Sequence, residues 1–158
     1  MDEFTKIART FSGVGVEVNT DTLECKTDGK IIYIPANSPD LKDNQKRVIH
    51  GMLDHEWLHC KAEKRAIDRG ERSFFETMGS LPDNSHRLVF NVYRDIIDER
   101  MGEKEFVGVS QNLENTYEHL INNLKNKKLP LFQEICSGMI VKAKGKDYSW
   151  LSEKAKEA

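Results

Sequence analysis

Long stretches of the chain place apolar residues one helical turn apart. Between residues 43 and 68 the apolar positions recur at intervals of three and four, with Gly51 as the only glycine and no proline. Because this spacing gathers apolar side chains on one face, it predicts a long helix, which Gly70 would end. The same signals predict four further helices, over residues 2–10, 85–102, 110–128 and 130–144.

The region before residue 43 has the pattern of β-strands. Val14, Val16 and Val18 alternate with other residues, which predicts an extended strand. Residues 22–26 and 30–35 flank Thr27-Asp28-Gly29, and an Asp-Gly pair favours the tight turn of an antiparallel hairpin. Residues 36–42 contain Asn, Ser, Pro and Asp, which predict a loop. We therefore expect one α+β domain over residues 1–158. A small antiparallel sheet in about residues 1–42 would pack on the mainly helical residues 43–158.

Composition excludes some function classes. The chain has 158 residues, with 24 basic against 26 acidic side chains. A chain of this length buries roughly 70% of its unfolded surface, so it does not need a metal merely to fold. No apolar run approaches the ~18 residues of a membrane-spanning helix, and the balanced charge argues against nucleic-acid binding. The three cysteines lie far apart and the N-terminus has no signal-peptide pattern, so the sequence predicts a cytoplasmic protein that acts on proteins or peptides.

Residues 55–59 read His-Glu-Trp-Leu-His inside the predicted long helix. Histidines four residues apart lie on the same helix face, so both can bind one ion, and H-E-x-x-H is the zinc pattern of metallopeptidases. Glu56 would project beside the ion, where a carboxylate can take a proton from water. The alternative is a histidine pair that is simply packed or exposed. His50 lies about 140° round the helix axis from His55, and Cys60 is expected to be a small buried hydrophobe.

A third ligand is expected from another helix, because a catalytic zinc has three protein ligands and keeps one position for water. The helix predicted over residues 85–102 carries Asn91, Asp95 and Glu99 at four-residue spacing beside its apolar line. These side chains would converge on the zinc if the two helices pack together. The alternative is a solvated acidic face. The spacing alone leaves open whether Asp95 or Glu99 binds the ion.

These motifs together resemble a known family. A strand ending in Ile-Pro, a helix with H-E-x-x-H and a later helix of the form N-x-x-E-D-x-R-x-E are similar to the metallopeptidase-like domain that precedes von Willebrand A domains in cobaltochelatase CobT-type proteins and related bacterial and phage proteins. In the second motif Asn91, Asp95 and Glu99 match. Arg94 stands where the family has Glu, and Ile97 where it has Arg.

The resemblance covers about residues 30–100 and implies a gluzincin-like zincin that binds one Zn²⁺ per chain. In such sites a carboxylate from a later helix completes the zinc ligands, and a second acid holds a ligand histidine by its outer N–H. The resemblance therefore implies Asp95 as the preferred third ligand beside His55 and His59. Glu99 would be the partner of one histidine or the alternative ligand. A von Willebrand A-type or other partner domain, in trans or in a longer chain, is also implied.

The function that we expect is that of a zinc-dependent metallopeptidase, in which a zinc-activated water attacks the peptide bond and Glu56 is the general base. The strand over residues 30–35 would pair with an extended substrate, or would be plain core. A catalytically silent zinc-binding interaction module of the same fold is the alternative, and a helical interaction domain without metal is the third. Candidates to stabilise the oxyanion, which the sequence does not rank, are Tyr93, Tyr117, His86, His119 and Tyr148.

Overall fold

The computed structural model describes residues 2–35, 41–125 and 127–157 of the chain. Most of the loop predicted over residues 36–42 lies outside the described residues. The elements confirm the α+β class, and the long helix has the predicted bounds. In chain order they are α1 (Glu3–Ser12), β1 (Glu17–Thr27), β2 (Ile31–Pro35), α2 (Asp43–Asp68), α3 (Phe74–Ser80), α4 (Asn84–Glu105), α5 (Val107–Leu124), α6 (Leu131–Ala143) and α7 (Glu153–Glu157).

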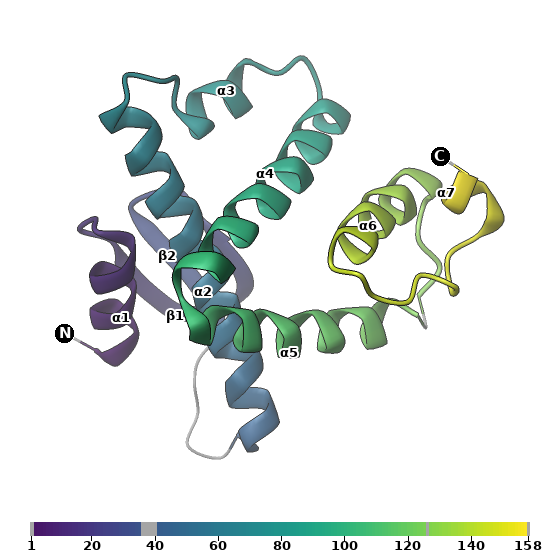
Figure 1. Cartoon of the computed structure of the whole chain (residues 1–158), viewed down its shortest axis with the longest axis horizontal. Helices are drawn as coiled ribbons and strands as arrows, with labels where there is room; N and C mark the ends of the chain where they lie inside the picture. Colours follow the sequence, from purple (N-terminus) through teal and green to yellow (C-terminus); the bar gives the residue numbers. More distant parts are fainter. Residues whose placement is uncertain (1, 36–40, 126, 158) are drawn as a thin grey trace.

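The long helix α2 is the central element, with the sheet behind it and α4 and α5 in front of it (Figure 1). Its apolar face is buried in a core to which Leu53 and Trp57 contribute from α2 and Ile32 and Ile34 from β2. The Leu53 and Ile32 side chains are fully shielded from water. Burying side chains of this size contributes about 1.5–3 kcal/mol each, so this face holds α2 against the sheet.

Gly51 lets α2 and α5 cross at close range. A Cβ atom at this position would lie 2.3 Å from the backbone oxygen of Asn112 in α5 and 2.0 Å from Oγ1 of Thr116. The Thr116 hydroxyl also donates a hydrogen bond to the Val48 carbonyl of α2, at 3.0 Å. The glycine that interrupts the apolar pattern of α2 therefore marks the crossing point of two helices.

The sheet has β2 in its middle. Ile32 pairs with both Val18 and Thr27 of β1, and Tyr33 pairs with both Asn19 and Lys26. Because a strand residue has one neighbour on each side, the two halves of β1 lie on opposite sides of β2. The second half forms the predicted hairpin with β2, whereas the first half runs parallel to β2, which the prediction of an antiparallel sheet did not include.

This pairing corrects the expected role of β2. The strand was predicted to offer a free edge to a substrate, but Ile32, Tyr33 and Pro35 have partners on both sides. A strand with two paired edges has no backbone groups left for an added strand. The prediction was therefore wrong, and the alternative of plain core structure holds, since Ile32 and Ile34 are fully buried.

A short helix, α3, lies between the helices predicted over residues 43–68 and 85–102, where the sequence pattern predicted no helix. Ser73 caps it, with its hydroxyl accepting from the Glu76 backbone N–H at 3.3 Å. Glu63 of α2 accepts a hydrogen bond from the Phe74 backbone N–H at 2.7 Å, so the start of α3 is tied to α2. Seven residues with a glycine give too weak a periodic signal for sequence prediction, and the tie to α2 supplies the missing stability.

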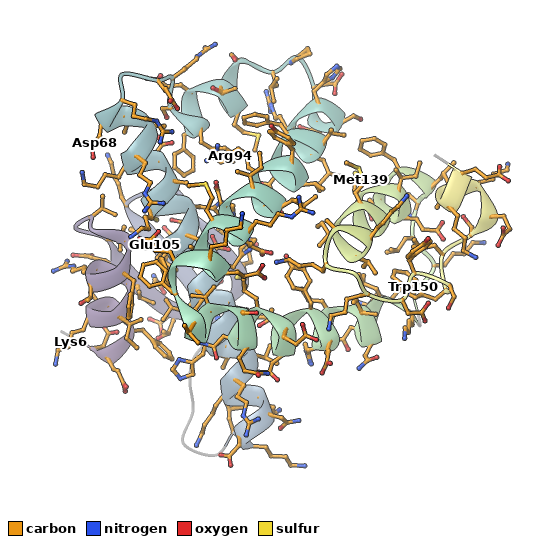
Figure 2. All side chains as sticks on the ribbon, viewed as in Figure 1. Lys6, Asp68, Arg94, Glu105, Met139 and Trp150 are labelled. Carbon is orange, nitrogen blue, oxygen red and sulfur yellow. The ribbon has the colours of Figure 1, made fainter. Side chains whose placement is uncertain are left out.

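The helices α6 and α7 form a C-terminal unit that lies beside α4 (Figure 1). Its buried side chains include Cys136, Val141 and Leu151. Figure 2 shows the side chains of the whole molecule, with Arg94 on α4 and Met139 and Trp150 on the C-terminal unit labelled. Among the described residues, no helix combines the length and apolar character that crossing a membrane requires.

Candidate metal centre

Three side chains from α2 and α4 converge on one point. The Nε2 atoms of His55 and His59 lie 3.2 Å apart. Oδ1 of Asp95 lies 3.1 Å from Nε2 of His59 and 3.9 Å from Nε2 of His55. The structure therefore brings together both histidines of the H-E-x-x-H motif and the carboxylate expected as third ligand. Among the described residues these three form the group whose side-chain atoms are close enough to share one ion.

The outer nitrogens of both imidazoles are held by carboxylates of α4. Nδ1 of His55 lies 2.7 Å from Oε1 of Glu99. Nδ1 of His59 lies 3.0 Å from Oδ2 of Asp98. An ionised carboxylate only accepts hydrogen bonds, so each Nδ1 donates to its carboxylate, and a ring without a second proton presents the lone pair of Nε2 to the common point. Glu99 is thus placed as the partner of His55, away from the point where the ligand atoms meet.

The donor set fits a divalent cation. When neither ring carries a second proton, two Nε2 lone pairs and a carboxylate oxygen converge, and this arrangement is repulsive unless a cation or added protons neutralise it. Ligand atoms about 2.0–2.1 Å from a tetrahedral Zn²⁺ lie about 3.3 Å from each other. The observed separations of 3.2 Å and 3.1 Å match this value, and 3.9 Å is somewhat longer.

The electrostatic surroundings of the His55 and His59 imidazoles also favour a cation at this point. Burial lowers the pKa of His55, but the hydrogen bond to Glu99 and the charges of Asp95, Glu56 and Glu99 outweigh it and raise that pKa to about 10. For His59 the pKa also rises, because hydrogen bonds to Asp95 and Asp98 outweigh burial. Carboxylates around the rings therefore stabilise positive charge at this point, which a metal ion would supply without protonating the ligands.

Each outer carboxylate has a cationic partner. Glu99, with 1% of its surface exposed, forms an ion pair with Lys144 at 2.7 Å and accepts a hydrogen bond from the Tyr117 hydroxyl at 2.6 Å. Burial raises the pKa of Glu99, yet His55 and Lys144 lower it to about 2. Asp98 forms an ion pair with Arg94 at 2.9 Å. Arg94, one of the two departures from the family pattern, therefore supports the partner of His59.

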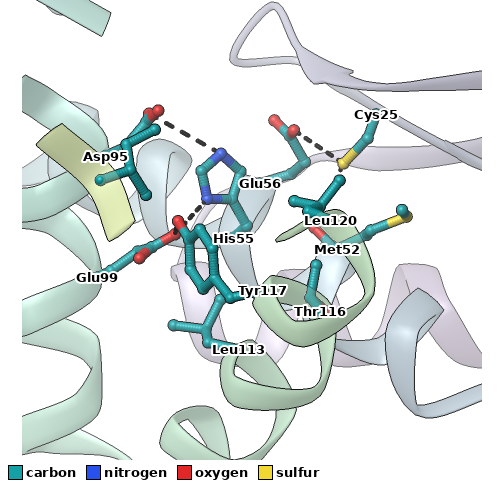
Figure 3. Close-up of a pocket in the computed structure, with 11 residues that line it drawn as sticks. Cys25, Met52, His55, Glu56, Asp95, Glu99, Leu113, Thr116, Tyr117 and Leu120 are labelled. Atoms are coloured by element: carbon teal, nitrogen blue, oxygen red, sulfur yellow. Dashed lines mark hydrogen bonds and ion pairs between the residues drawn. The ribbon is translucent and has the colours of Figure 1, made fainter. Parts of the chain in front are cut away.

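Glu56 lines the same cavity as His55 and Asp95, and the residues that line it are drawn in Figure 3. The cavity measures about 230 Å³ and is lined by His55, Glu56 and Asp95 together with apolar side chains such as Leu113. Glu56 is 4% exposed, and its Oε1 accepts a hydrogen bond from the Cys25 thiol at 3.1 Å. The motif glutamate is thus placed where it can act on a molecule in the cavity.

An irregular stretch of β1 brings Cys25 to this cavity. The pairing register shifts between Thr22, which pairs with Pro35, and Lys26, which pairs with Tyr33. Three residues of β1 thus oppose one of β2, and such a bulge redirects a side chain from its regular position. Burial and the charge of Glu56 raise the pKa of the Cys25 thiol. The thiol is therefore present as a protonated hydrogen-bond donor to Glu56.

The structure also places the other residues that the sequence singled out. Asn91 donates to both oxygens of Asp95, at 3.3 Å and 3.2 Å, and so orients that carboxylate. His50 packs edge-on against Phe4, with ring centroids 5.4 Å apart, and Cys60 is a core residue, as predicted. Of the five oxyanion candidates only Tyr117 is among the residues that line the cavity, and its hydroxyl is committed to Glu99.

Sequence reasoning missed three residues of this centre. Asp98 had a signal, because it lies three residues from Asp95 and therefore on the same side of α4. Lys144 and Cys25 had none, since they come from segments far from the motif helices in sequence and only the folding of the chain brings them to the site.

Comparison with known proteins gave no match: no family model, curated protein or solved structure matches this chain.

Proposed function

We propose that the protein is a zinc-dependent peptidase of the gluzincin-like zincin type, with one Zn²⁺ per chain. One observation carries the proposal: Nε2 of His55, Nε2 of His59 and Oδ1 of Asp95 converge on one point, and two of these residues, His55 and Asp95, line a cavity together with Glu56. The Nδ1 atom of each ring bonds to its own carboxylate, as in metal sites where an outer partner fixes the ring. A pair of merely packed histidines would not need both partners.

The residues of the site would have the following roles in peptide-bond hydrolysis. His55, His59 and Asp95 would hold the zinc ion, which when bound would supply a Lewis acid for the carbonyl and for water. Glu56 would accept a proton from a water in the cavity and pass it to the leaving amine, as its place in the cavity allows. Asp98 and Glu99 keep both imidazoles in the tautomer that presents Nε2 to the ion. Leu113 and its apolar neighbours exclude water from the cavity wall.

The substrate would be an extended protein or peptide. Because β2 has partners on both sides, the sheet edges are the outer edges of the two halves of β1, and we propose the edge of the second half for pairing. Cys25 lies on this half and lines the cavity, so the edge runs beside the metal site. Backbone pairing along such an edge gives affinity with little demand on side chains.

The test measures metal content and cleavage separately. Purified protein and its Glu56→Gln and His59→Ala variants are assayed for zinc per chain, and then for cleavage of an unbiased peptide library. We expect about one zinc in the first two and a loss in His59→Ala, with cleavage only in the unchanged protein. His50→Ala is the matched control, because His50 is a histidine of the same helix that packs on Phe4. Stoichiometric zinc with no cleavage that depends on Glu56 would overturn the peptidase.

The second candidate is a zinc-binding interaction module without hydrolysis. The hydrogen bond from the Cys25 thiol favours it, because the thiol occupies a lone pair of Oε1 of the base Glu56. In this case Glu56→Gln would leave partner binding unchanged, while loss of His55 or His59 would abolish it. A von Willebrand A-type domain, in trans or in a longer chain, is the partner that the motif resemblance suggests. A cytoplasmic location remains our prediction from the three free cysteines.

A further inference from the structure

The hydrogen-bond network of the metal centre extends into the C-terminal unit. Lys144 follows directly on α6, and its Nζ lies 2.7 Å from Oε2 of Glu99 and 2.7 Å from Oε1 of Glu103. The same Nζ lies 5.3 Å from the centroid of the Tyr117 ring. Lys144 is largely buried, with 11% of its side chain exposed. A buried ammonium held by two carboxylates and an aromatic face is not a solvated surface charge.

Glu99 occupies the centre of this network. Its Oε1 is shared by Nδ1 of His55 and the Tyr117 hydroxyl, and its Oε2 faces Lys144. Each oxygen therefore has its own set of partners on opposite sides of the carboxylate. In the part of the chain that the structure describes, Lys144 is the one lysine or arginine that forms an ion pair with Glu99. Removal of this lysine would leave a carboxylate that is 1% exposed without its fixed cation.

We propose that Lys144 is a positioning residue of the metal centre, through which the C-terminal unit of α6 and α7 sets the orientation of His55. The proposal rests on the zinc site of the proposed function. Glu99 holds Nδ1 of His55 through Oε1 only while the carboxylate is correctly turned, and Lys144 holds the other oxygen, Oε2, and so fixes this orientation. The order of contacts is Lys144 to Glu99, Glu99 to His55, and His55 to the ion.

This chain of contacts implies that zinc binding and the docking of α6 against α4 affect each other. If docking of α6 against α4 improves the geometry of His55, then zinc binding must stabilise that docking by the same free energy, because linkage is reciprocal. Two further contacts accompany the lysine: Arg100 of α4 donates to the Ala143 carbonyl at 3.4 Å, and Ile140 of α6 packs against the core and lines the cavity. Lys144 is the residue of the C-terminal unit that forms an ion pair with the partner of His55.

The experiment compares zinc affinity in the unchanged protein and in Lys144→Met, Lys144→Arg and Lys142→Met, with a chromophoric chelator as competitor. Loss of an outer partner weakens metal binding by roughly 10–100-fold, and we expect a weakening of this size for Lys144→Met. Lys144→Arg should recover part of the affinity, since it restores the charge. Lys142→Met is the matched control, because Lys142 is an exposed lysine of α6, and its affinity should stay within about twofold.

Two further measurements separate positioning from a general loss of structure. The visible spectrum of the Co²⁺-loaded protein should shift in Lys144→Met and not in Lys142→Met, because it reports ligand geometry. Tyr117→Phe, which removes the other bond to Glu99, should weaken zinc binding in the same direction even if Lys144→Met folds poorly. Unchanged affinity and spectrum in folded Lys144→Met would overturn the proposal. Failure of the unchanged protein to bind zinc would instead refute the metal site itself.

Discussion

Oδ2 of Asp98 lies 3.0 Å from Nδ1 of His59, and the same carboxylate forms an ion pair with Arg94. Asp98 is 3% exposed. Arg94 and Asp98 lie four residues apart on α4, so one helix supplies both the partner of the histidine and the cation that supports this partner. His59 is thus held by Asp98 and Arg94, and neither of these residues is at a matched position of the motif.

We predict that Asp98→Asn weakens zinc binding by roughly 10–100-fold. The amide keeps the size of the side chain but loses the charge that keeps the proton on Nδ1 of His59. Chelator competition measures the change, and Asp68→Asn, an exposed acid at the end of α2, is the control. Equal affinities in Asp98→Asn and the control would show that Asp98 does not support the ligand.

The two acids singled out by the sequence should differ in their effects. Asp95→Asn removes a charged oxygen from the convergence point, whereas Glu99→Gln changes only the partner of His55. We expect Asp95→Asn to lower zinc affinity more than Glu99→Gln, which should lose roughly 10–100-fold. Affinities measured for both variants in one assay decide the question. The reverse order would make Glu99 the third ligand.

The metal-free protein should lose stability as the pH rises. The ordinary pKa of a histidine is near 6.5, whereas Glu99 and the neighbouring carboxylates outweigh burial and raise that of His55 to about 10 in the folded protein. A raised pKa stabilises the fold fully below pH 6.5, and this contribution disappears as the pH rises through 10. Each pKa unit corresponds to about 1.4 kcal/mol.

Denaturant unfolding of the metal-free protein at pH 6 and pH 9 tests this expectation. The free energy of unfolding should fall between these two pH values, by on the order of 1 kcal/mol or more. His55→Gln should show a smaller pH dependence, because its side chain does not titrate. A pH dependence of the same size in His55→Gln would assign the effect to other groups.

The crossing of α2 and α5 should not tolerate a larger residue at Gly51. A Cβ atom there would lie 2.3 Å from a backbone oxygen, which cannot move aside as a flexible side chain can. We expect Gly51→Ala to lower the free energy of unfolding by about 1–3 kcal/mol or more, despite the better helix propensity of alanine. Gly79→Ala in α3, where a Cβ would meet nothing within 4 Å, should be neutral or stabilising. Equal stability of both variants would contradict the close crossing.

Cys25 should be the first of the three cysteines to react with iodoacetamide. It is the exposed one, whereas Cys60 and Cys136 are buried. Its labelling should still be slower than that of a free peptide thiol, because the sulfur itself lies at the cavity against Glu56, where burial and the charge of Glu56 raise its pKa. Mass spectrometry of the labelled protein measures both the order in which the three cysteines react and the rate of labelling at Cys25.

Labelled protein should keep its zinc and lose its peptidase activity, because the added group enters the cavity beside Glu56. Cys25→Ser should resist this inactivation. Full cleavage by protein labelled at Cys25 would place the thiol outside the path of the substrate.

The sequence by itself determined the helical pattern and the ligand pair on α2. Periodicity predicted residues 43–68 as one helix, which has these bounds, and the four-residue spacing put His55 and His59 on the same face. The same spacing on α4 singled out Asp95 and Glu99. These features are local, since a helix fixes which of its own residues share a face before any tertiary contact forms.

Only the tertiary structure decided which groups surround the ligand pair. It placed Asp95 at the Nε2 atoms and Glu99 at the Nδ1 atom of His55, a choice that depends on how α4 packs against α2. It also put β2 between the two halves of β1, and brought Cys25 and Lys144 to the site from distant segments. Periodicity shows which face of an element is polar or apolar, but the neighbour of that face follows from the packing of the whole chain.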